Sequence, residues 1–386
     1  MIGSCFLVLA SQAWHAHPRI LAWHAHPQPY SRGSATISAS VDAQSVYSTS
    51  AAIDTLWNLP CTQEECIVGD EDPNVGGPLP NPMRVSRFTT VSKLWTHEDW
   101  ERHVHPNRML FNILTWPYST IIRALWPVLL ALLCWTRVVW LCQLSFTPTA
   151  LGFLASPLGL LLAFRVNSVV ARFHEARSMW GMLIFTARDA SSTLAAAHAK
   201  IPLATRLRCC RLLVCFGWAV KAATRPEDDV RPVLDALLPA DEAATVAASR
   251  KPPLALLSRL RKTLQPLPLP HHVALHLQTS VSELNRHYGG MERLLSTPLS
   301  PTYMRHALRG LLLWFAMLPC GLLSAGCKSW AKLAIVCVAT AYIMLGIDEI
   351  GVQIENPFEV LPLHGLAAVL TKDVVEELLG QEDADA

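Results

Sequence analysis

The sequence has little charge for its length. Of its 386 residues, 16% are Asp, Glu, Lys or Arg and 51% are hydrophobic, whereas a soluble protein usually carries about 25% charged residues. The stretch from 138 to 164 contains no charged residue at all. The net charge is only +2, so the chain lacks the strong positive charge of a nucleic-acid-binding protein. These shortages favour an integral membrane protein without a nucleic-acid partner.

The sequence also lacks the spacings of a disulfide framework, a metal site or a catalytic centre. Its eleven cysteines are an odd number, and Cys61 and Cys66 allow at most one surface disulfide. Five cysteines fall inside apolar runs and are expected to be small buried hydrophobic residues: Cys134, Cys142, Cys320, Cys327 and Cys337. A membrane enzyme would need polar groups that act together, and the histidines before the first apolar run, His97, His103 and His105, have no matching carboxylate spacing. We expect no metal, no cofactor and no enzymatic activity.

The first residues lack acidic side chains. No Asp or Glu precedes Asp42, whereas Ser, Ala and Thr are abundant and Arg19 and Arg32 are present. This composition is typical of an organelle transit peptide, which we predict for residues 1–50. Residues 51–92 are polar and contain several Pro and Gly, so they are expected to form a linker or extended arm.

Long apolar runs predict membrane spans. A bilayer core requires about 20 apolar residues in a helix, and Thr147-Pro148 divides the first long run into a helical hairpin. The fourth run, Leu333–Ile347, is short and is expected to be partly covered by protein. We predict four transmembrane helices, with both termini on one side, at residues 121–143, 149–170, 310–327 and 333–350.

Between the second and third spans lies a long polar segment, residues 172–309. It contains 19 Lys and Arg against 10 Asp and Glu. The positive-inside rule would place such an excess on the cytoplasmic or stromal side, although the rule applies mainly to shorter loops. Helical spacing of apolar residues predicts a helical soluble region, interrupted by an irregular stretch at the prolines Pro252, Pro253, Pro266, Pro268 and Pro270. Residues 366–386 are predicted to be an acidic tail. The expected fold class is all-α.

The second span continues directly into charged and aromatic residues. Ser156–Asn167 ends in Phe-Arg-Val-Asn, and Arg172–Gly181 reads Arg-Phe-His-Glu-Ala-Arg-Ser-Met-Trp-Gly. Three further stretches occur in the order expected of one family: Leu94–Trp100, Ser296–Tyr303 and Gly346–Phe358. Together these motifs resemble the bestrophin family, over a channel domain expected at residues 93–365.

The resemblance implies a homopentamer with one axial pore that conducts chloride or other small anions passively across a bilayer. Its neck would be lined by Ser156, Leu160 and Phe164, whose spacing of four puts them on one face of a helix. An apolar ring costs a loosely hydrated anion less than a small cation, and the edge of a Phe ring is partly positive. Ser156 departs from the family, in which the outer neck residue is usually apolar.

Polar residues near the membrane boundary receive structural roles from the resemblance. Arg165 would anchor the neck to the soluble region, although a long side chain at the end of a span can also simply snorkel to the interface. The carboxylates near the fourth span would pair with Arg165 or Arg172, with cation binding as the other possibility. Trp180 is expected to anchor at the membrane interface. The complete predicted set is Arg165, Asn167, Arg172, Glu175, Arg177, Asp348, Glu349 and Glu355.

The end of the motif region indicates a branch of the family. Animal bestrophins carry acidic residues there that form a calcium clasp, whereas here only Glu359 follows Asn356-Pro357-Phe358, too few carboxylates for calcium. This ending looks more like the plant thylakoid chloride channels. With the leader, it predicts a chloroplast thylakoid membrane, with the plasma membrane as the alternative.

A bicarbonate-conducting channel and a secondary anion transporter remain as alternative functions, although a transporter would show inverted repeats.

Overall fold

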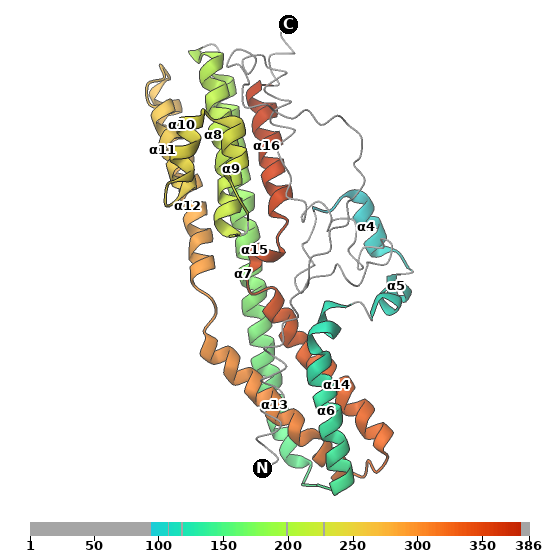
Figure 1. Ribbon diagram of the computed structural model, residues 1–386. Coiled ribbons are helices and arrows are strands. Elements are labelled where there is room, and N and C mark those ends of the chain that lie inside the picture. The colour runs from blue at the N-terminus through green and yellow to red at the C-terminus, as the bar shows by residue number, and fades with distance from the viewer. Residues whose placement is uncertain (1–93, 107, 117–118, 198–199, 227, 380–386) are drawn as a thin grey trace. The chain divides into compact units, whose positions relative to one another are not determined.

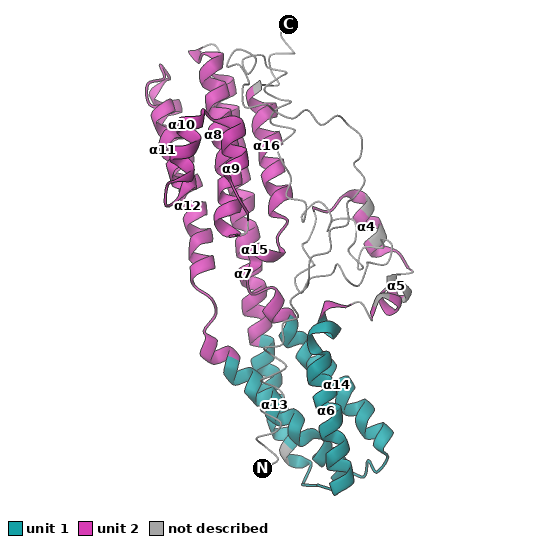
Figure 2. Cartoon of the chain, viewed as in Figure 1, with its two compact units in different colours: residues 1–46, 121–163, 305–349 teal, residues 47–120, 164–304, 350–386 magenta. Residues whose placement is uncertain are grey.

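In this computed structural model, residues 94–379 are described, apart from 107, 117–118, 198–199 and 227. The predicted transit peptide, the linker at 51–92, Cys61, Cys66 and the last residues of the predicted tail lie outside these residues. Within the described part, every regular element is a helix (Figure 1), as the predicted all-α fold class requires. The chain divides into two compact units (Figure 2). The described parts of unit 1 are 121–163 and 305–349.

Four helices are long and apolar enough to cross a membrane, which confirms the predicted number of spans. They are α6 (Thr120–Cys142), α7 (Thr149–Ala196), α13 (Pro301–Ser324) and α14 (Trp330–Gln353). Unit 1 holds most of α6, α13 and α14 and the first part of α7. Its apolar core includes Leu132, Leu162, Leu311 and Leu333, one residue from each helix.

Indole donors inside unit 1 reach backbone carbonyls. Trp135 Nε1 donates to the carbonyl of Ala316 at 2.8 Å, and Trp314 Nε1 donates to the carbonyl of Leu151 at 3.1 Å. A polar hydrogen in a bilayer has no water to bond, so an unmet donor there would cost several kcal/mol. These bonds therefore let tryptophans pack the helices together inside the membrane.

The helices differ in length from the apolar runs that predicted them. α7 continues to Ala196 because no breaker follows residue 170, so the second span and the start of the soluble region form a single helix of 48 residues. α13 begins at Pro301, where proline suits the first turn of a helix. α14 has 24 residues, so the fourth span is longer than its apolar run indicated.

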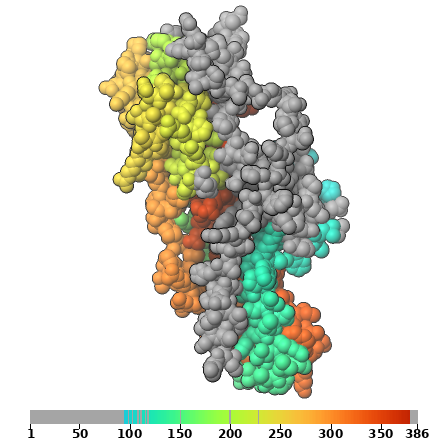
Figure 3. Space-filling view, in the orientation of Figure 1, coloured from blue at the N-terminus to red at the C-terminus, as the bar shows by residue number. Residues whose placement is uncertain are grey.

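Unit 2 is built around α8 (Leu203–Thr224), a helix buried on most sides. It packs against α11 (Pro252–Leu264) and α16 (Leu363–Leu379). The other helices lying wholly within this unit are α4 (His97–Val104), α5 (Arg108–Thr115), α9 (Arg231–Leu237), α10 (Ala240–Ala247), α12 (His271–Ser296) and α15 (Pro357–Val360). In the space-filling view, the yellow α9–α11 region forms one continuous surface (Figure 3).

Several local predictions for unit 2 need correction. Pro252 and Pro253 begin α11 instead of breaking the chain, because the first turn of a helix needs no backbone N–H. The predicted boundary at residue 365 lies inside α16, whose Val374 and Leu378 belong to the buried core. Trp180 is fully buried in that same core, so it does not anchor at a membrane interface.

The predicted burial of the cysteines holds for only part of the set. Cys320 and Cys337 are buried, but Cys134 and Cys142 are exposed on α6. An apolar run shows that a helix avoids water, yet it does not say which face meets protein and which is left for lipid. In α8, burial raises the pKa of Cys209 and of Cys210 to about 12, so both thiols stay protonated and unreactive at neutral pH.

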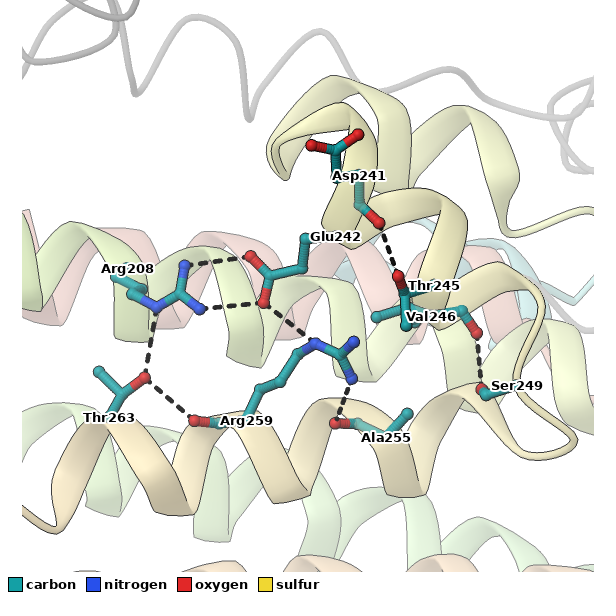
Figure 4. Close-up of polar contacts among 9 residues, drawn as sticks. All are labelled: Arg208, Asp241, Glu242, Thr245, Val246, Ser249, Ala255, Arg259 and Thr263. Atoms are coloured by element: carbon teal, nitrogen blue, oxygen red, sulfur yellow. Dashed lines mark hydrogen bonds and ion pairs between the residues drawn. The ribbon is translucent and has the colours of Figure 1, made fainter.

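A charged cluster joins three helices of unit 2 (Figure 4). Glu242 of α10 accepts two hydrogen bonds from Arg208 of α8, at 2.9 and 3.1 Å, and its Oε1 lies 3.1 Å from Nε of Arg259 on α11. Arg208 Nε also donates to the hydroxyl of Thr263 at 3.3 Å. Paired hydrogen bonds of this kind are directional, so the cluster sets how α10 lies against α8 and α11.

Candidate pore-lining site

The first part of α7 has one exposed and one buried face. Leu160 and Phe164 are 56% and 55% exposed, and Ser156 is also exposed. Leu162 and Arg165, by contrast, are 4% and 2% exposed. The three predicted neck residues therefore share a helix face that the described part of the chain leaves uncovered.

This exposed face continues along the helix. At the same helical spacing it passes the exposed residues Ala171, His174, Ser178, Met182 and Phe185. With Phe153 at its start, the exposed stripe of α7 covers 33 residues, or about 48 Å at 1.5 Å per residue. A bilayer core is about 30 Å thick. Lipid tails therefore cannot cover the whole stripe, and part of it must meet water or another protein surface.

The stripe changes character along its length. Its beginning is apolar, with Phe153, Leu160 and Phe164 all exposed. Beyond these come the exposed Asn167, His174 and Ser178, so the next turns are polar, and the exposed Met182 and Phe185 make the far end apolar again. An apolar beginning followed by polar turns suits a narrow dry segment that opens into a wider aqueous one.

Arg172 and Glu175 attach α7 to the end of α12. Arg172 donates to the carbonyls of Leu294 and Thr297, at 2.7 and 2.8 Å, and Glu175 forms an ion pair with Arg293. The last carbonyls of a helix lack intrahelical partners and carry partial negative charge. A guanidinium supplies both the missing hydrogen-bond donors and the opposite charge. Arg172 and Glu175 thus both bond to a second helix. Arg177 remains exposed.

Arg165, Arg172 and Glu355 form a second charged group within unit 2. A methyl added at Gly351 would lie 3.6 Å from Nε of Arg165, so the guanidinium passes close to the backbone there. Burial raises the pKa of Glu355, whereas the charges of Arg165 and Arg172 lower it, and burial has the larger effect. The predicted partnership of Glu355 with these arginines therefore has an electrostatic basis. Asp348 and Glu349 are buried, and their pairing remains a prediction.

Sequence reasoning missed the buried cations of α8 and the turn after it. Arg225 donates to the carbonyls of Phe358 and Leu361, at 2.9 and 3.1 Å. Lys221 forms a buried ion pair with Asp228, at 3.2 Å. A charged residue is normally exposed, so nothing in the sequence indicated burial of Arg225. For Lys221, the apolar residues on its N-terminal side were the one sign of burial.

The segment after Asn356 is held by protein groups. Besides the Arg225 bonds, Asn356 Nδ2 donates to Glu359 at 2.8 Å. Among the residues that the structure describes, no group of three or more His, Cys, Asp or Glu could hold a metal ion. Before the first span, His97 lies 3.3 Å from Glu101, and both side chains are exposed.

Known proteins share this sequence pattern and fold. The family model for bacterial and fungal bestrophin proteins matches residues 100–376. The chain is 28% identical over 316 residues to a chloroplastic voltage-dependent chloride channel of Arabidopsis thaliana, which covers 78% of this chain and 76% of the relative. It is 29% identical over 303 residues to a voltage-dependent anion channel-forming protein of Ralstonia nicotianae, and the aligned residues cover 72% of this chain and 94% of that protein.

Solved structures agree on the fold. The crystal structure of a bacterial bestrophin homologue from Klebsiella pneumoniae matches with a TM-score of 0.60 and 23% identity, covering 65% of this chain and 97% of that one. The family model spans most of the chain and includes α6, α7, α13 and α14. The chain therefore belongs to the bestrophin family.

Proposed function

We propose that this chain forms a passive channel for small anions such as chloride, with α7 lining the conduction path of a homopentamer. The observation that carries the proposal is the exposed stripe of α7, which is longer than a bilayer core is thick. Membership of the bestrophin family supports it, as do relatives named as chloride and anion channels. Several copies with this stripe turned inward would enclose a path without exposing it to lipid.

The chemistry of the stripe suits an anion. Leu160 and Phe164 would form two apolar rings, which a loosely hydrated anion crosses at lower cost than a small hard cation. The partly positive edges of the phenylalanine rings face such an ion favourably. Ser156 would put hydroxyl groups at the outer ring, so the dry part of the neck would be two rings deep. An apolar constriction of this kind can also close by losing its water.

Recording in planar bilayers tests the proposal, with gradients of chloride, nitrate, bicarbonate and sodium. We expect reversal potentials that follow the anions, and a clear change in conductance or selectivity in Leu160→Ala and Phe164→Ala. Leu313→Ala is the matched control, because Leu313 is similarly exposed but lies on α13. Reversal that follows sodium, or equal effects of Leu160→Ala and Leu313→Ala, would contradict the proposed path. Flux that requires a second coupled ion and shows no single-channel steps would identify a transporter.

We also propose that the protein works in the thylakoid membrane. The composition of residues 1–50 and the relative named as chloroplastic support this location. A fusion of residues 1–50 to a fluorescent protein should be imported and shortened by isolated chloroplasts, and the full chain should fractionate with thylakoids. Recovery in the plasma membrane, without shortening, would overturn the location while leaving the channel proposal intact.

A further inference from the structure

The two short loops of unit 1 lie against each other. The α13–α14 turn is ordered by its own backbone: Gly326 has φ +97°, and the N–H of Cys327 donates to Leu322 at 3.1 Å. This is the pattern of a glycine-terminated helix end. Ser324 donates to the carbonyl of Phe146 in the α6–α7 loop, at 2.6 Å. The two loops therefore form one fixed surface where four membrane helices begin or end.

On this surface a guanidinium contacts two indole rings. The Arg137 guanidinium carbon lies 4.7 Å from the centre of the Trp140 ring and 5.1 Å from that of Trp330. Trp140 Nε1 donates to the carbonyl of Lys328 at 2.9 Å, which fixes its ring against the α13–α14 turn. Arg137 is thus oriented by two aromatic rings, and its side chain is exposed, so its N–H groups can reach an acceptor.

Among the residues of unit 1 that the structure describes, no carboxylate lies near the positive charges of this surface. Lys328 and Lys332 are exposed and flank Trp330 in the chain. The carboxylates among the described residues of unit 1 are Asp348 and Glu349. The nearer of them is separated from Lys332 by 16 residues of α14, or about 24 Å. No ion pair within this part of unit 1 can therefore neutralise the three cations.

We propose that Arg137, Lys328 and Lys332 bind the phosphate or sulfonate headgroup of an anionic membrane lipid. Membrane helices begin or end at this surface, so lipid headgroups surround it, and tryptophan is enriched at that depth. Arg137 would supply paired donors to the oxygens of the headgroup, and the two lysines would add charge. Because Arg137 belongs to α6 and the lysines to the α13–α14 region, the bound lipid would tie these elements together. This inference does not depend on ion conduction.

Lipid titration of the purified full chain in neutral detergent tests the proposal, with phosphatidylglycerol binding measured by native mass spectrometry. The test variant combines Arg137→Gln, Lys328→Gln and Lys332→Gln. Its control combines Lys200→Gln, Arg250→Gln and Lys262→Gln, three exposed cations of unit 2. A basic residue near an anionic lipid surface contributes about fivefold in affinity. We therefore expect at least a tenfold weaker affinity in the test variant and little change in the control.

Two further arms separate the possible results. Phosphatidylcholine has a phosphate but no net charge, and it should bind the parent and the test variant alike. Inorganic phosphate should not compete at concentrations equal to those of the lipid; effective competition would indicate a site for a free anion and overturn the lipid assignment. Arg137→Lys keeps the charge but loses the planar guanidinium, and it should bind phosphatidylglycerol with intermediate affinity. Equal lipid loss in the test and control triples would also reject the site.

Discussion

Glu242 shows how one carboxylate can hold three helices. It accepts hydrogen bonds from Arg208 and pairs with Arg259, and its side chain is largely shielded from solvent. In Glu242→Gln the two guanidinium groups would face each other without their shared anion. We expect a loss of about 2–3 kcal/mol in the free energy of unfolding, since removing one partner of a shielded charge group leaves the others uncompensated.

Asp241 provides the matched control for this prediction. It is adjacent to Glu242 in α10 but its side chain is exposed (Figure 4), and surface substitutions usually change stability by less than about 0.5 kcal/mol. Thermal unfolding in detergent should therefore separate Glu242→Gln clearly from Asp241→Asn. Equal unfolding temperatures for the two variants would show that the cluster contributes nothing specific.

Glu355 predicts a pH effect on stability. Burial raises its pKa above the usual 4.5 in the folded protein, so above that pH the folded state binds more protons than the unfolded state. The free energy of unfolding then falls as the pH rises from about 4.5 through the raised pKa. Glu355→Gln cannot ionise, so its unfolding temperature should decline less than that of the parent over this range.

The measurement is the unfolding temperature in detergent between pH 4.5 and 7. Glu376→Gln removes one exposed carboxylate from α16 and controls for the change in net charge. If Glu355→Gln and the parent follow parallel curves, burial of Glu355 has no energetic consequence for folding.

At the scale of elements, one arginine makes two of the bonds that join α7 to α12. Arg172 donates to two carbonyls near the end of α12, whereas Arg177, less than two turns further along α7, is exposed. Arg172→Gln should lower the free energy of unfolding by about 1–3 kcal/mol, because a charged donor to the helix end is lost. Arg177→Gln should have little effect. Thermal unfolding, with proteolysis near residue 297 as a second readout, distinguishes the two; equal results would mean that the junction does not need Arg172.

The adjacent glycines of α12 provide a sharper test of packing. A methyl at Gly289 would meet nothing within 4 Å, whereas a methyl at Gly290 would lie 2.7 Å from Cε of Met179 on α7. Gly289→Ala should raise the free energy of unfolding by about 0.5–1 kcal/mol, because alanine favours the helix. Gly290→Ala should gain less, or lose stability, since Met179 must move. The measurement is the unfolding temperature of each variant, which should be higher for Gly289→Ala. A higher unfolding temperature for Gly290→Ala would contradict the close packing of α7 and α12.

For the whole molecule, the proposed path requires an assembly. A single chain leaves the exposed stripe of α7 uncovered, and five copies around one axis would enclose it. Multi-angle light scattering in detergent, corrected for bound detergent, should give five times the 42.6 kDa of one chain, less any leader that has been removed. Phe164→Ala should keep this mass, because the substitution removes no charge and no buried core residue. A stable monomer or dimer would end the pentamer proposal.

Much of this architecture follows from local sequence. The number of membrane helices could be predicted because a helix of about 20 apolar residues is long enough to cross the bilayer core and meets its own backbone hydrogen bonds there. The beginning of α4 is local in the same way, since Thr96 donates two hydrogen bonds to Asp99, both at 2.9 Å, within a single turn. The spacing of Ser156, Leu160 and Phe164 likewise determined that they share a helix face.

Tertiary structure decided which partner each charged or aromatic group would have. Arg172 bonds to the end of α12, Arg225 reaches the segment after Asn356, and Trp180 lies in the core of unit 2. The two arginine contacts join residues more than 100 positions apart, and the burial of Trp180 depends on which helices pack together. No local sequence pattern encodes either. The sequence by itself determined that the chain is helical, how many helices can span a membrane and which residues share a helix face. Only packing determined which faces the protein covers, because burial depends on neighbours brought together by the fold.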